Sequence, residues 1–445
     1  MLTLGLSHAL RQQGKVVQLF KKGPDYIDPM WHRTASGRDS YNLDSYMMGD
    51  DTCLRSFLDH SSGSTLNIIE GNLGLHDGMD LEGENSSAAL AKLLKAPVIL
   101  AIDARGMNRN AAAIVYGLQH FDPEVTIGGV VLNQVRSSRQ AEKMIQAIEK
   151  YCAVPVLGAI PIQEKEFIGE RHLGLITPKE VAEGELIIES MGRVVMEHVD
   201  LEQVLNIAHS APFLDPPRPS PNQVLKSSGS PNVTIGVAFD PAFCFYYQDN
   251  LDALKNMGAN LVFFDTMHDE ELPEVDGLFL AGGFPESFPH QLSANKKLRD
   301  SIAKKIEAGL PTYAECGGMM YLTQALLLDG NRHEMVGVIP AEVEFTKRPV
   351  GYGYVDLSPN PTNKDSSWLH LSRPIRGHEF HYSRLVNLET DLTYLYDIHR
   401  GAGMGDGKDG ILYKNMIASY THLHASAVPE WAESFVAISK KWKKE

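Results

Sequence analysis

The chain has 445 residues, more than one ordinary hydrophobic core accommodates, so its length predicts two domains. Hydrophobic residues make up 43% and charged residues 22%, as in folded globular proteins, and no apolar run approaches the roughly 18 residues of a membrane helix. A formal net charge of −15 argues against a nucleic-acid binder. The four cysteines form no CxxC pair, which argues against a disulfide framework or zinc knuckle and fits a cytoplasmic protein without a signal peptide.

The first half of the chain alternates short, continuous apolar segments with helical ones. After a helix over 2–13, we expect strands at 15–20, 65–70, 96–103, 126–133 and 154–160. The helices between them are expected at 86–95, 106–120 and 140–150. This alternation is typical of a parallel sheet with helices on both faces, in which ligands bind beyond the carboxyl ends of the strands.

A segment rich in Pro and Ser, residues 210–231, interrupts the pattern and is typical of a linker. The alternation then restarts, with strands expected at 233–239, 259–264, 277–281 and 311–315 and helices at 247–257, at 294–307 and from 318. The sequence therefore predicts an α/β protein with two parallel-sheet domains, residues 1–209 and 232–445, joined by that linker.

Cys316 directly follows the predicted strand at 311–315 and precedes two glycines that open a helix. A thiol on such a tight turn is expected to be exposed, and a helix N-terminus favours the thiolate, so the pattern predicts a nucleophile. The amide N–H groups of Gly317 and of Gly283, in the Gly-Gly turn after another strand, would stabilise an oxyanion. The other three cysteines lack this context and are interpreted as core residues.

A cysteine nucleophile needs a base, and histidines in two later segments are candidates. GHEFHYS carries His378 and His381, and ASYTHLHAS carries His422 and His424. Periodicity alone does not choose among the four.

Carboxylates follow two strands of the first half. Asp25 and Asp28 flank a turn in GPDYIDP, Glu70 ends the strand TLNIIE, and Asp77 lies in the next loop. We expect these two loops to bring the carboxylates to one sheet edge, where hard oxygen ligands suit Mg²⁺ held with phosphate. For any one of them, ordinary turn chemistry is an equal alternative.

The segments AECGGMMYL, LFLAGGFPE and ASYTHLH resemble the class I glutamine amidotransferase domain of the cobyrinic acid synthase type, over about residues 233–436. In that family the cysteine attacks glutamine and releases ammonia through a thioester. The resemblance implies that Cys316 is the nucleophile and that His422 raises its nucleophilicity. Other class I relatives place a Glu two residues beyond that histidine, where His424 stands here. The resemblance therefore implies a Cys–His dyad, with structural or substrate-side roles for the other three histidines.

The segments GPDYIDPMWH, NLDSYMM, IIEGNLGLHDGMD and LNQV resemble the ATP-dependent synthetase domain of cobyrinic acid a,c-diamide synthases, a fold related to dethiobiotin synthetase and to MinD-type P-loop proteins. That family activates a carboxylate with ATP as an acyl phosphate, which ammonia converts to an amide. The resemblance implies that Asp25 and Glu70 bind Mg²⁺–ATP. It gives Asp28 and Asp77 a role in binding metal or in positioning the substrate.

The family begins with a strand and a Gly-rich phosphate loop ending in Gly-Lys-Thr, but this sequence contains no G-x-x-x-x-G-K-[ST]. Its first residues resemble the helix that follows that loop. We interpret the chain as truncated, the alternative being loss of ATP use. Either way we expect poor ATP binding and an open place in the first sheet.

The family's substrates are polycarboxylate tetrapyrroles, namely cobyrinic acid, hydrogenobyrinic acid and sirohydrochlorin. The stretch from EGNLGLHDGMD to ARGMNRNAAA resembles the sirohydrochlorin enzymes. Cationic side chains on the predicted loops, either substrate ligands or solvated surface, are Lys21, Lys22, Arg33, Arg105 and Arg109.

The expected function is ATP- and glutamine-dependent amidation of the a and c acetate side chains of such a tetrapyrrole, cobyrinic acid or sirohydrochlorin. Mg²⁺ and ATP are the expected cofactors. Glutamine and the tetrapyrrole are the expected partners, with no nucleic acid and no membrane, and a homodimer stays open. The alternatives are a MinD-like regulatory ATPase fused to an inactive amidotransferase module, and a truncated, inactive synthase.

Overall fold

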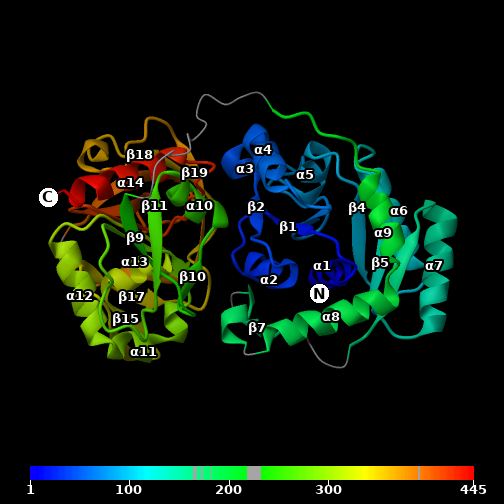
Figure 1. The fold of residues 1–445 in the computed structure, drawn as a ribbon, viewed down its shortest axis with the longest axis horizontal. Helices are drawn as coiled ribbons and strands as arrows, with labels where there is room; N and C mark the ends of the chain where they lie inside the picture. Colours follow the sequence, from blue (N-terminus) through cyan, green and yellow to red (C-terminus); the bar gives the residue numbers. More distant parts are fainter. Residues whose placement is uncertain (164–167, 172–173, 182, 218–231, 389–390, 445) are drawn as a thin grey trace. The chain divides into compact units, whose positions relative to one another are not determined.

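The computed structural model describes residues 1–163, 168–171, 174–181, 183–217, 232–388 and 391–444 (Figure 1). The chain divides into two compact units, Met1–Arg218 and Pro219–Glu445. The finer division into 1–209, a linker at 210–231 and 232–445 stays a prediction, because 218–231 lies outside the described residues.

Unit 1 contains two three-stranded parallel sheets. The strands of the first, in spatial order, are β2 (Tyr41–Leu43), β1 (Val17–Lys22) and β3 (Leu66–Glu70). Those of the second are β4 (Val98–Asp103), β5 (Ile127–Val135) and β6 (Val156–Pro161). In the described part of the chain no strand joins β3 to β4, so each sheet keeps an unpaired edge, in agreement with the open place that the sequence predicts.

Helices cover these sheets (Figure 1). They are α1 (Leu2–Gln12), α2 (Ile27–Ser36), α3 (Ser45–Met48), α4 (Asp50–His60), α5 (Ser87–Leu93), α6 (Asn110–Phe121), α7 (Ser138–Cys152), α8 (Gly184–His198) and α9 (Leu201–His209). Short elements in the same unit are β7 (Glu170–Arg171), β8 (Gly174–Leu175) and η1 (Pro178–Glu180). Local chemistry sets several helix ends: the Ser86 and Ser137 hydroxyls accept backbone N–H bonds at the starts of α5 and α7, and Gly37 ends α2 in the left-handed conformation.

Unit 2 is built on a nine-stranded sheet. In spatial order its strands are β11 (Ala259–Phe264), β9 (Val233–Ala238), β12 (Gly277–Leu280), β14 (Thr312–Glu315), β23 (Met416–Ser419), β22 (Lys408–Tyr413), β21 (Thr393–Arg400), β18 (Gly351–Pro359) and β19 (Ile375–His381). The first five are parallel and the rest antiparallel. A four-stranded sheet consists of β16 (Asn331–Glu334), β15 (Thr323–Leu328), β17 (Ile339–Phe345) and β20 (Ser383–Val386).

The remaining elements of unit 2 are helices and short strands. They are β10 (Phe243–Phe245), α10 (Gln248–Asn256), β13 (Gly282–Gly283), η2 (Pro285–Ser287), α11 (Pro289–Ala294), α12 (Lys296–Glu307), α13 (Gly317–Leu322), η3 (Lys364–Ser366) and α14 (Pro429–Trp442). The large sheet separates two hydrophobic cores, and β12 contributes Leu278 and Leu280 to one and Phe279 to the other. All three side chains are fully buried, as expected for a central strand of a sheet covered on both faces.

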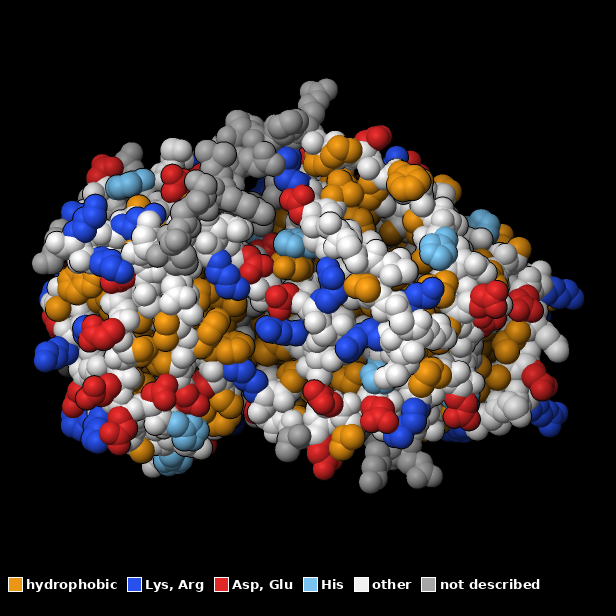
Figure 2. Space-filling model, viewed as in Figure 1, with side chains coloured by type: hydrophobic (Ala, Val, Ile, Leu, Met, Phe, Trp, Pro, Cys, Tyr) orange, Lys and Arg blue, Asp and Glu red, His pale blue; other side chains and the backbone are white. Residues whose placement is uncertain are grey.

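The predicted strands and helices are present, but their bounds and number differ from the prediction. The strand predicted at 15–20 runs from Val17 to Lys22, so Lys21 and Lys22 are buried strand residues and not loop residues. The strands between 323 and 413, which pair antiparallel except for β15 with β17, were not predicted. Nor were the strand β2 and the helices α2, α3, α4, α8 and α9. No helix in the described residues is long and apolar enough to cross a membrane. On the face drawn in Figure 2, acidic and basic side chains are interspersed in both units.

Candidate active site

Cys316 occupies the turn between β14 and α13 with φ 45° and ψ −107°. A positive φ in a non-glycine residue stores about 1–3 kcal/mol of strain, and such strain gathers at functional sites. The Cys316 N–H donates to the Ser419 carbonyl at 2.7 Å, which ties the turn to the end of β23. The side chain is only 4% exposed, so the expectation of an exposed thiol is wrong. The turn is placed among the packed ends of the parallel strands.

The electrostatics of the thiol also differ from expectation. Burial, and then the nearby charge of Glu286, raise the pKa of Cys316 well above its usual range, although the Gly317 N–H opposes this. Burial thus opposes the thiolate that the helix N-terminus was expected to favour. The Cys316 Sγ makes a weak contact of 3.9 Å with the Phe380 carbonyl. A base is needed to remove the proton.

His422 follows β23 and meets Cys316 at Gly282. A Cβ added to Gly282 would lie 2.6 Å from His422 Cε1, 3.3 Å from its Nε2 and 3.5 Å from Cys316 Cβ. Glycine is therefore required where the imidazole and the cysteine converge. The opposite ring nitrogen, Nδ1, lies 3.3 Å from Glu315 Oε2, and both side chains are 2% exposed. His422 thus has its Nδ1 edge on a carboxylate, while its Cε1 and Nε2 border the same space beside Gly282 as the Cys316 Cβ.

Glu315 is held by further hydrogen bonds. Its Oε1 accepts from the Leu423 N–H at 2.9 Å and from the Tyr313 hydroxyl at 2.9 Å. A role for Glu315 was not predicted, because other class I relatives place the carboxylate after the histidine and not before the cysteine. The available signal was a Glu at the last position of a buried strand.

The segment before His422 is held by hydrogen bonds to Asp409. This fully buried carboxylate accepts from the N–H groups of Tyr420 and Thr421 at 3.0 and 2.9 Å, and from the Thr421 hydroxyl at 2.6 Å. Burial raises the pKa of Asp409, and these hydrogen bonds oppose the rise. The backbone leading into the histidine is therefore fixed without any ligand.

The segment after His422 is fixed by Asn250, which is 1% exposed. Its side-chain N–H donates to the Leu423 carbonyl at 2.8 Å, and its Oδ1 accepts from the Ala425 N–H at 2.7 Å. An asparagine that pairs with both backbone groups fixes the chain much as a neighbouring strand would.

The two predicted oxyanion donors lie next to each other. A Cβ added to Gly317 would lie 3.1 Å from the Gly283 nitrogen, and one added to Gly283 would lie 2.0 Å from the Ala242 carbonyl oxygen. Neither position has room for a side chain without a shift. The adjacent backbones are compatible with a shared oxyanion site, and that role stays a proposal.

The other three candidate histidines have different surroundings. His424 is fully buried, with Nδ1 accepting from the Ser426 N–H at 3.2 Å and Nε2 3.4 Å from an Asp249 carboxylate oxygen. Burial, and then the charge of His422, lower the pKa of His378 to about 3, so this imidazole is neutral at physiological pH. Its ring centroid lies 6.5 Å from that of His422.

His381 belongs to a separate buried cluster. Its Nε2 lies 3.5 Å from Glu379 Oε2, its Nδ1 donates to the Ser383 carbonyl at 2.9 Å, and its ring stacks on Tyr420. With Nδ1 on the Ser383 carbonyl, the remaining nitrogen, Nε2, faces Glu379.

In unit 1, two of the four predicted carboxylates, Asp28 and Glu70, lie beside Lys21. The buried ammonium lies 2.5 Å from Asp28 Oδ2 and 3.5 Å from Glu70 Oε1. The other oxygen of Glu70 contacts His32 Nε2 at 2.8 Å. Although burial opposes it, the His32 hydrogen bond and the Lys21 charge hold the pKa of Glu70 well below its usual range. The structure thus makes Lys21 a buried ion-pair centre and excludes a solvated surface role for it.

Asp25 and Asp77 serve local turns. The Oδ1 of Asp25 accepts from the Ile27 and Asp28 N–H groups at 3.0 and 2.9 Å, and burial, and then the Asp28 charge, raise its pKa to about 6. Asp77 is exposed and accepts from the Gly74 N–H at 3.0 Å. Among the described residues no group of three or more His, Cys, Asp or Glu side chains is arranged to hold a metal.

The remaining predicted cations are placed as follows. Arg33 and Arg105 pair with neighbouring aspartates, at 3.2 Å for Asp39 and 2.6 Å for Asp103. Arg109 donates to the Tyr151 hydroxyl at 3.1 Å. These contacts fit the surface interpretation of the three arginines.

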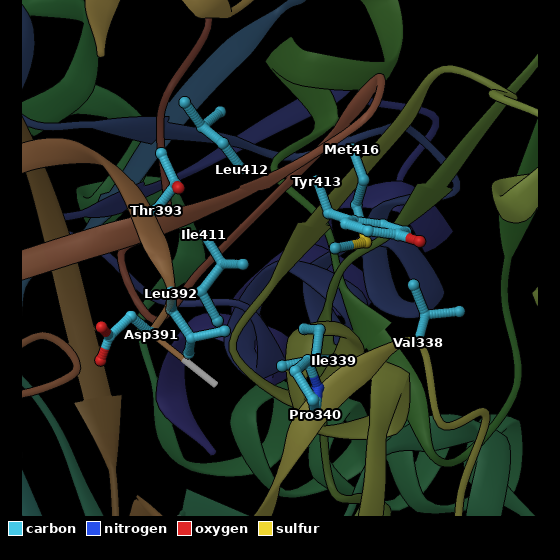
Figure 3. Close-up of a pocket in the computed structure, with 10 residues that line it drawn as sticks. All are labelled: Val338, Ile339, Pro340, Asp391, Leu392, Thr393, Ile411, Leu412, Tyr413 and Met416. Atoms are coloured by element: carbon cyan, nitrogen blue, oxygen red, sulfur yellow. The ribbon is translucent and has the colours of Figure 1, made fainter. Parts of the chain in front are cut away.

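A cavity of about 320 Å³ opens between the two sheets of unit 2 (Figure 3). It is lined by Val338, Ile339, Pro340, Asp391, Leu392, Thr393, Ile411, Leu412, Tyr413 and Met416. None of these residues belongs to the Cys316 site, so this cavity is separate from the predicted chemistry.

Comparison with known proteins finds a family match for each of the two units. Residues 1–173 match the CobQ/CobB/MinD/ParA nucleotide binding domain, and residues 234–429 match the CobB/CobQ-like glutamine amidotransferase domain. The chain is therefore a glutamine-dependent carbon–nitrogen ligase with a nucleotide-binding domain.

Relatives of similar length extend the match over nearly the whole chain. A cobyrinate a,c-diamide synthase of Magnetococcus marinus is 44% identical over 97% of this chain and 92% of its own length. Enzymes of the same name from Listeria monocytogenes and Archaeoglobus fulgidus are 41% and 40% identical, over 95% and 100% of this chain and 92% and 95% of theirs. With both domains matched in this order and relatives this similar from end to end, the chain belongs to the cobyrinate a,c-diamide synthase family.

Proposed function

We propose that this protein amidates the a and c acetate side chains of cobyrinate, with ATP to activate each carboxylate and glutamine as the source of ammonia. The observation that carries the proposal is the 44% identity to an enzyme of that name over 97% of the chain. The geometry at Cys316 and His422 supports the glutamine half, and the match to a nucleotide binding domain supports the ATP half.

In the glutamine half, Cys316 is the nucleophile and His422 the base. His422 Nε2 takes the thiol proton, and the thiolate attacks the side-chain carbonyl carbon of glutamine. The N–H groups of Gly283 and Gly317 stabilise the oxyanion. The protonated His422 then gives its proton to the departing ammonia, and water hydrolyses the thioester to release glutamate. A raised thiol pKa fits this order, because the proton leaves only when the base and substrate are in place.

In the ATP half, a substrate carboxylate attacks the terminal phosphate of ATP and displaces ADP, and ammonia then displaces phosphate from the resulting acyl phosphate to give the amide. Asp25 and Glu70 would hold Mg²⁺ with the nucleotide, and Asp28 and Asp77 would assist in binding or positioning. Asp25 suits a cation, because burial and the Asp28 charge raise its pKa to about 6. Glu70 is already paired with Lys21 and His32, so its share in the metal site rests on the resemblance alone. Bound Mg²⁺ would neutralise charge on the phosphates.

The test is a competition assay. The protein is given cobyrinate and sirohydrochlorin in equal concentration with Mg²⁺–ATP and glutamine, and the products are identified by mass spectrometry. Two hydroxyl-to-amino mass changes on cobyrinate are expected. The same changes on sirohydrochlorin alone would contradict the substrate, and no change on either acid would contradict the synthase.

Cys316→Ala is the matched control for the nitrogen source. It should abolish glutamine hydrolysis and glutamine-dependent amidation, while amidation with free ammonium at high concentration persists, because the variant leaves unit 1 unchanged. Loss of both activities in a variant that still folds would contradict the division of labour between the two units.

A further inference from the structure

We propose that Glu315, the residue directly before the nucleophile, is the positioning residue of the catalytic histidine and completes a Cys316–His422–Glu315 triad. The inference rests on the proposed glutamine hydrolysis and deepens it. The resemblance implies only a cysteine–histidine dyad, because the position two residues beyond His422 is occupied by His424 and not by a carboxylate.

The geometry assigns the tautomer of the histidine. The other oxygen of Glu315 already accepts two hydrogen bonds, so we assign the donor role between Glu315 Oε2 and His422 Nδ1 to the imidazole. With Nδ1 protonated, Nε2 keeps its lone pair, and this nitrogen borders the space beside Gly282 that the Cys316 Cβ also borders. Glu315 therefore sets the ring in the form that can accept the thiol proton. The 3.3 Å separation is long, as catalytic hydrogen bonds often are before substrate binds.

The second oxygen of Glu315 holds the carboxylate in place. It accepts from the Tyr313 hydroxyl within β14 and from the Leu423 N–H, directly after the histidine. The carboxylate is thus tied to its own strand and to the His422 segment. Because it is 2% exposed, its charge is not screened by water and acts on the imidazolium that forms during catalysis.

Strand pairing explains how a residue before the cysteine reaches the histidine. The parallel strands β14 and β23 lie side by side, with Glu315 opposite Ser419. His422 comes three residues beyond Ser419, where the chain turns back across the strand end. Glu315, at the end of β14, thus reaches Nδ1 of the imidazole, and Cys316, the next residue, lies with the rest of the ring beside Gly282. In the trypsin-type triad the carboxylate has the same effect, keeping the tautomer and stabilising the imidazolium without taking the proton.

The decisive variant is Glu315→Gln, which keeps size but offers an N–H where a carboxylate accepted one. It should lower glutaminase kcat by at least about 100-fold with KM for glutamine changed by less than about threefold, since an amide in a triad supports the wrong tautomer. The acidic limb of kcat/KM should move to lower pH, because His422 loses the charge that stabilises its protonated form. Glu315→Asp, which keeps the carboxylate, should recover part of kcat and return the limb toward the parent.

Tyr313→Phe is the matched control, since it removes one hydrogen bond to Glu315 and leaves the carboxylate on His422. It should move the acidic limb by less than Glu315→Gln does, because the carboxylate still faces His422 Nδ1. Thermal melting and labelling of Cys316 by 6-diazo-5-oxo-L-norleucine verify that each variant folds and binds. The inference is overturned if folded Glu315→Gln keeps kcat within about threefold of the parent, or if Tyr313→Phe shifts the limb equally. A parent protein without glutaminase activity that Cys316→Ala removes would instead overturn the proposed function.

Discussion

The buried polar groups of the two units are held in different ways. Around His422, the carboxylate of Asp409 and the amide of Asn250 bind backbone N–H and carbonyl groups. Around Lys21, the partners are other charged side chains, chiefly Asp28 and Glu70. The first arrangement fixes the chain itself, whereas the second balances charge among side chains.

This difference indicates how far the site in each unit keeps its geometry when no ligand is bound. Backbone-bound groups keep their geometry without a ligand, so the Cys316 site is preorganised for glutamine. A cluster of carboxylates around one lysine is sensitive to any added charge, because a phosphate or cation changes the balance that holds it. We therefore expect mutations in unit 2 to affect rate through geometry, and mutations in unit 1 to affect stability through charge.

The largest effect is expected from Gly282→Ala. The new methyl group would lie 2.6 Å from His422 Cε1, so the ring must move, and misplacement of a catalytic group by about 1 Å lowers rates by about 100-fold. Glutaminase kcat should fall by that order while the melting temperature changes little.

The matched control for Gly282→Ala is Gly117→Ala in α6, where nothing lies within 4 Å of the added carbon and activity should be unchanged. Parent-level kcat in Gly282→Ala would contradict a preorganised His422.

A second prediction separates a structural histidine from the catalytic one. His424→Gln should lower the free energy of unfolding by about 1–3 kcal/mol, because a buried site loses its fitted partners at Asp249 and Ser426. The acidic limb of kcat/KM should stay in place, as chemical denaturation and a pH profile of the same variant would verify.

The exposed His290 supplies the control for that variant, since His290→Gln should leave both quantities unchanged. A shift of the acidic limb of kcat/KM in His424→Gln would contradict the structural role that the contacts of His424 indicate.

The parts that sequence reasoning predicted are those encoded locally. Buried parallel strands are continuous apolar runs, so segments such as TLNIIE and VTIGVAF can be recognised as strands. A cysteine between a strand and Gly-Gly likewise indicates a nucleophile. The Glu315–His422 contact joins residues 107 positions apart and exists only because β14 pairs with β23. The burial of Lys21 likewise depends on carboxylates from two other segments. Long-range pairing of polar residues leaves no period in the sequence and so was missed.

The smallest effect is expected in unit 1, from Asp25→Asn. The pKa of Asp25 rises from 3.8 to about 6 in the folded protein, so the folded state holds a proton that the unfolded chain has released between these values. The stability this group contributes is therefore present below about pH 4 and lost as pH rises through about 6. Asparagine keeps the oxygen that accepts from Ile27 and Asp28, and it removes the buried charge. The variant should gain about 1–2 kcal/mol at pH 7 and nothing near pH 3.5.

Glu70→Gln supplies the opposite case, because the pKa of Glu70 is lowered by His32 and Lys21 despite its burial. Its contribution is present above the ordinary pKa of a carboxyl group, so this variant should lose stability at pH 7. Urea denaturation of both variants across pH 3.5–8 measures the two slopes. Opposite shifts would establish that charge balance holds the Lys21 cluster. Equal losses in both variants would instead mean that the cluster, like the His422 segment, is held by fixed geometry, and the contrast between the two units would fail.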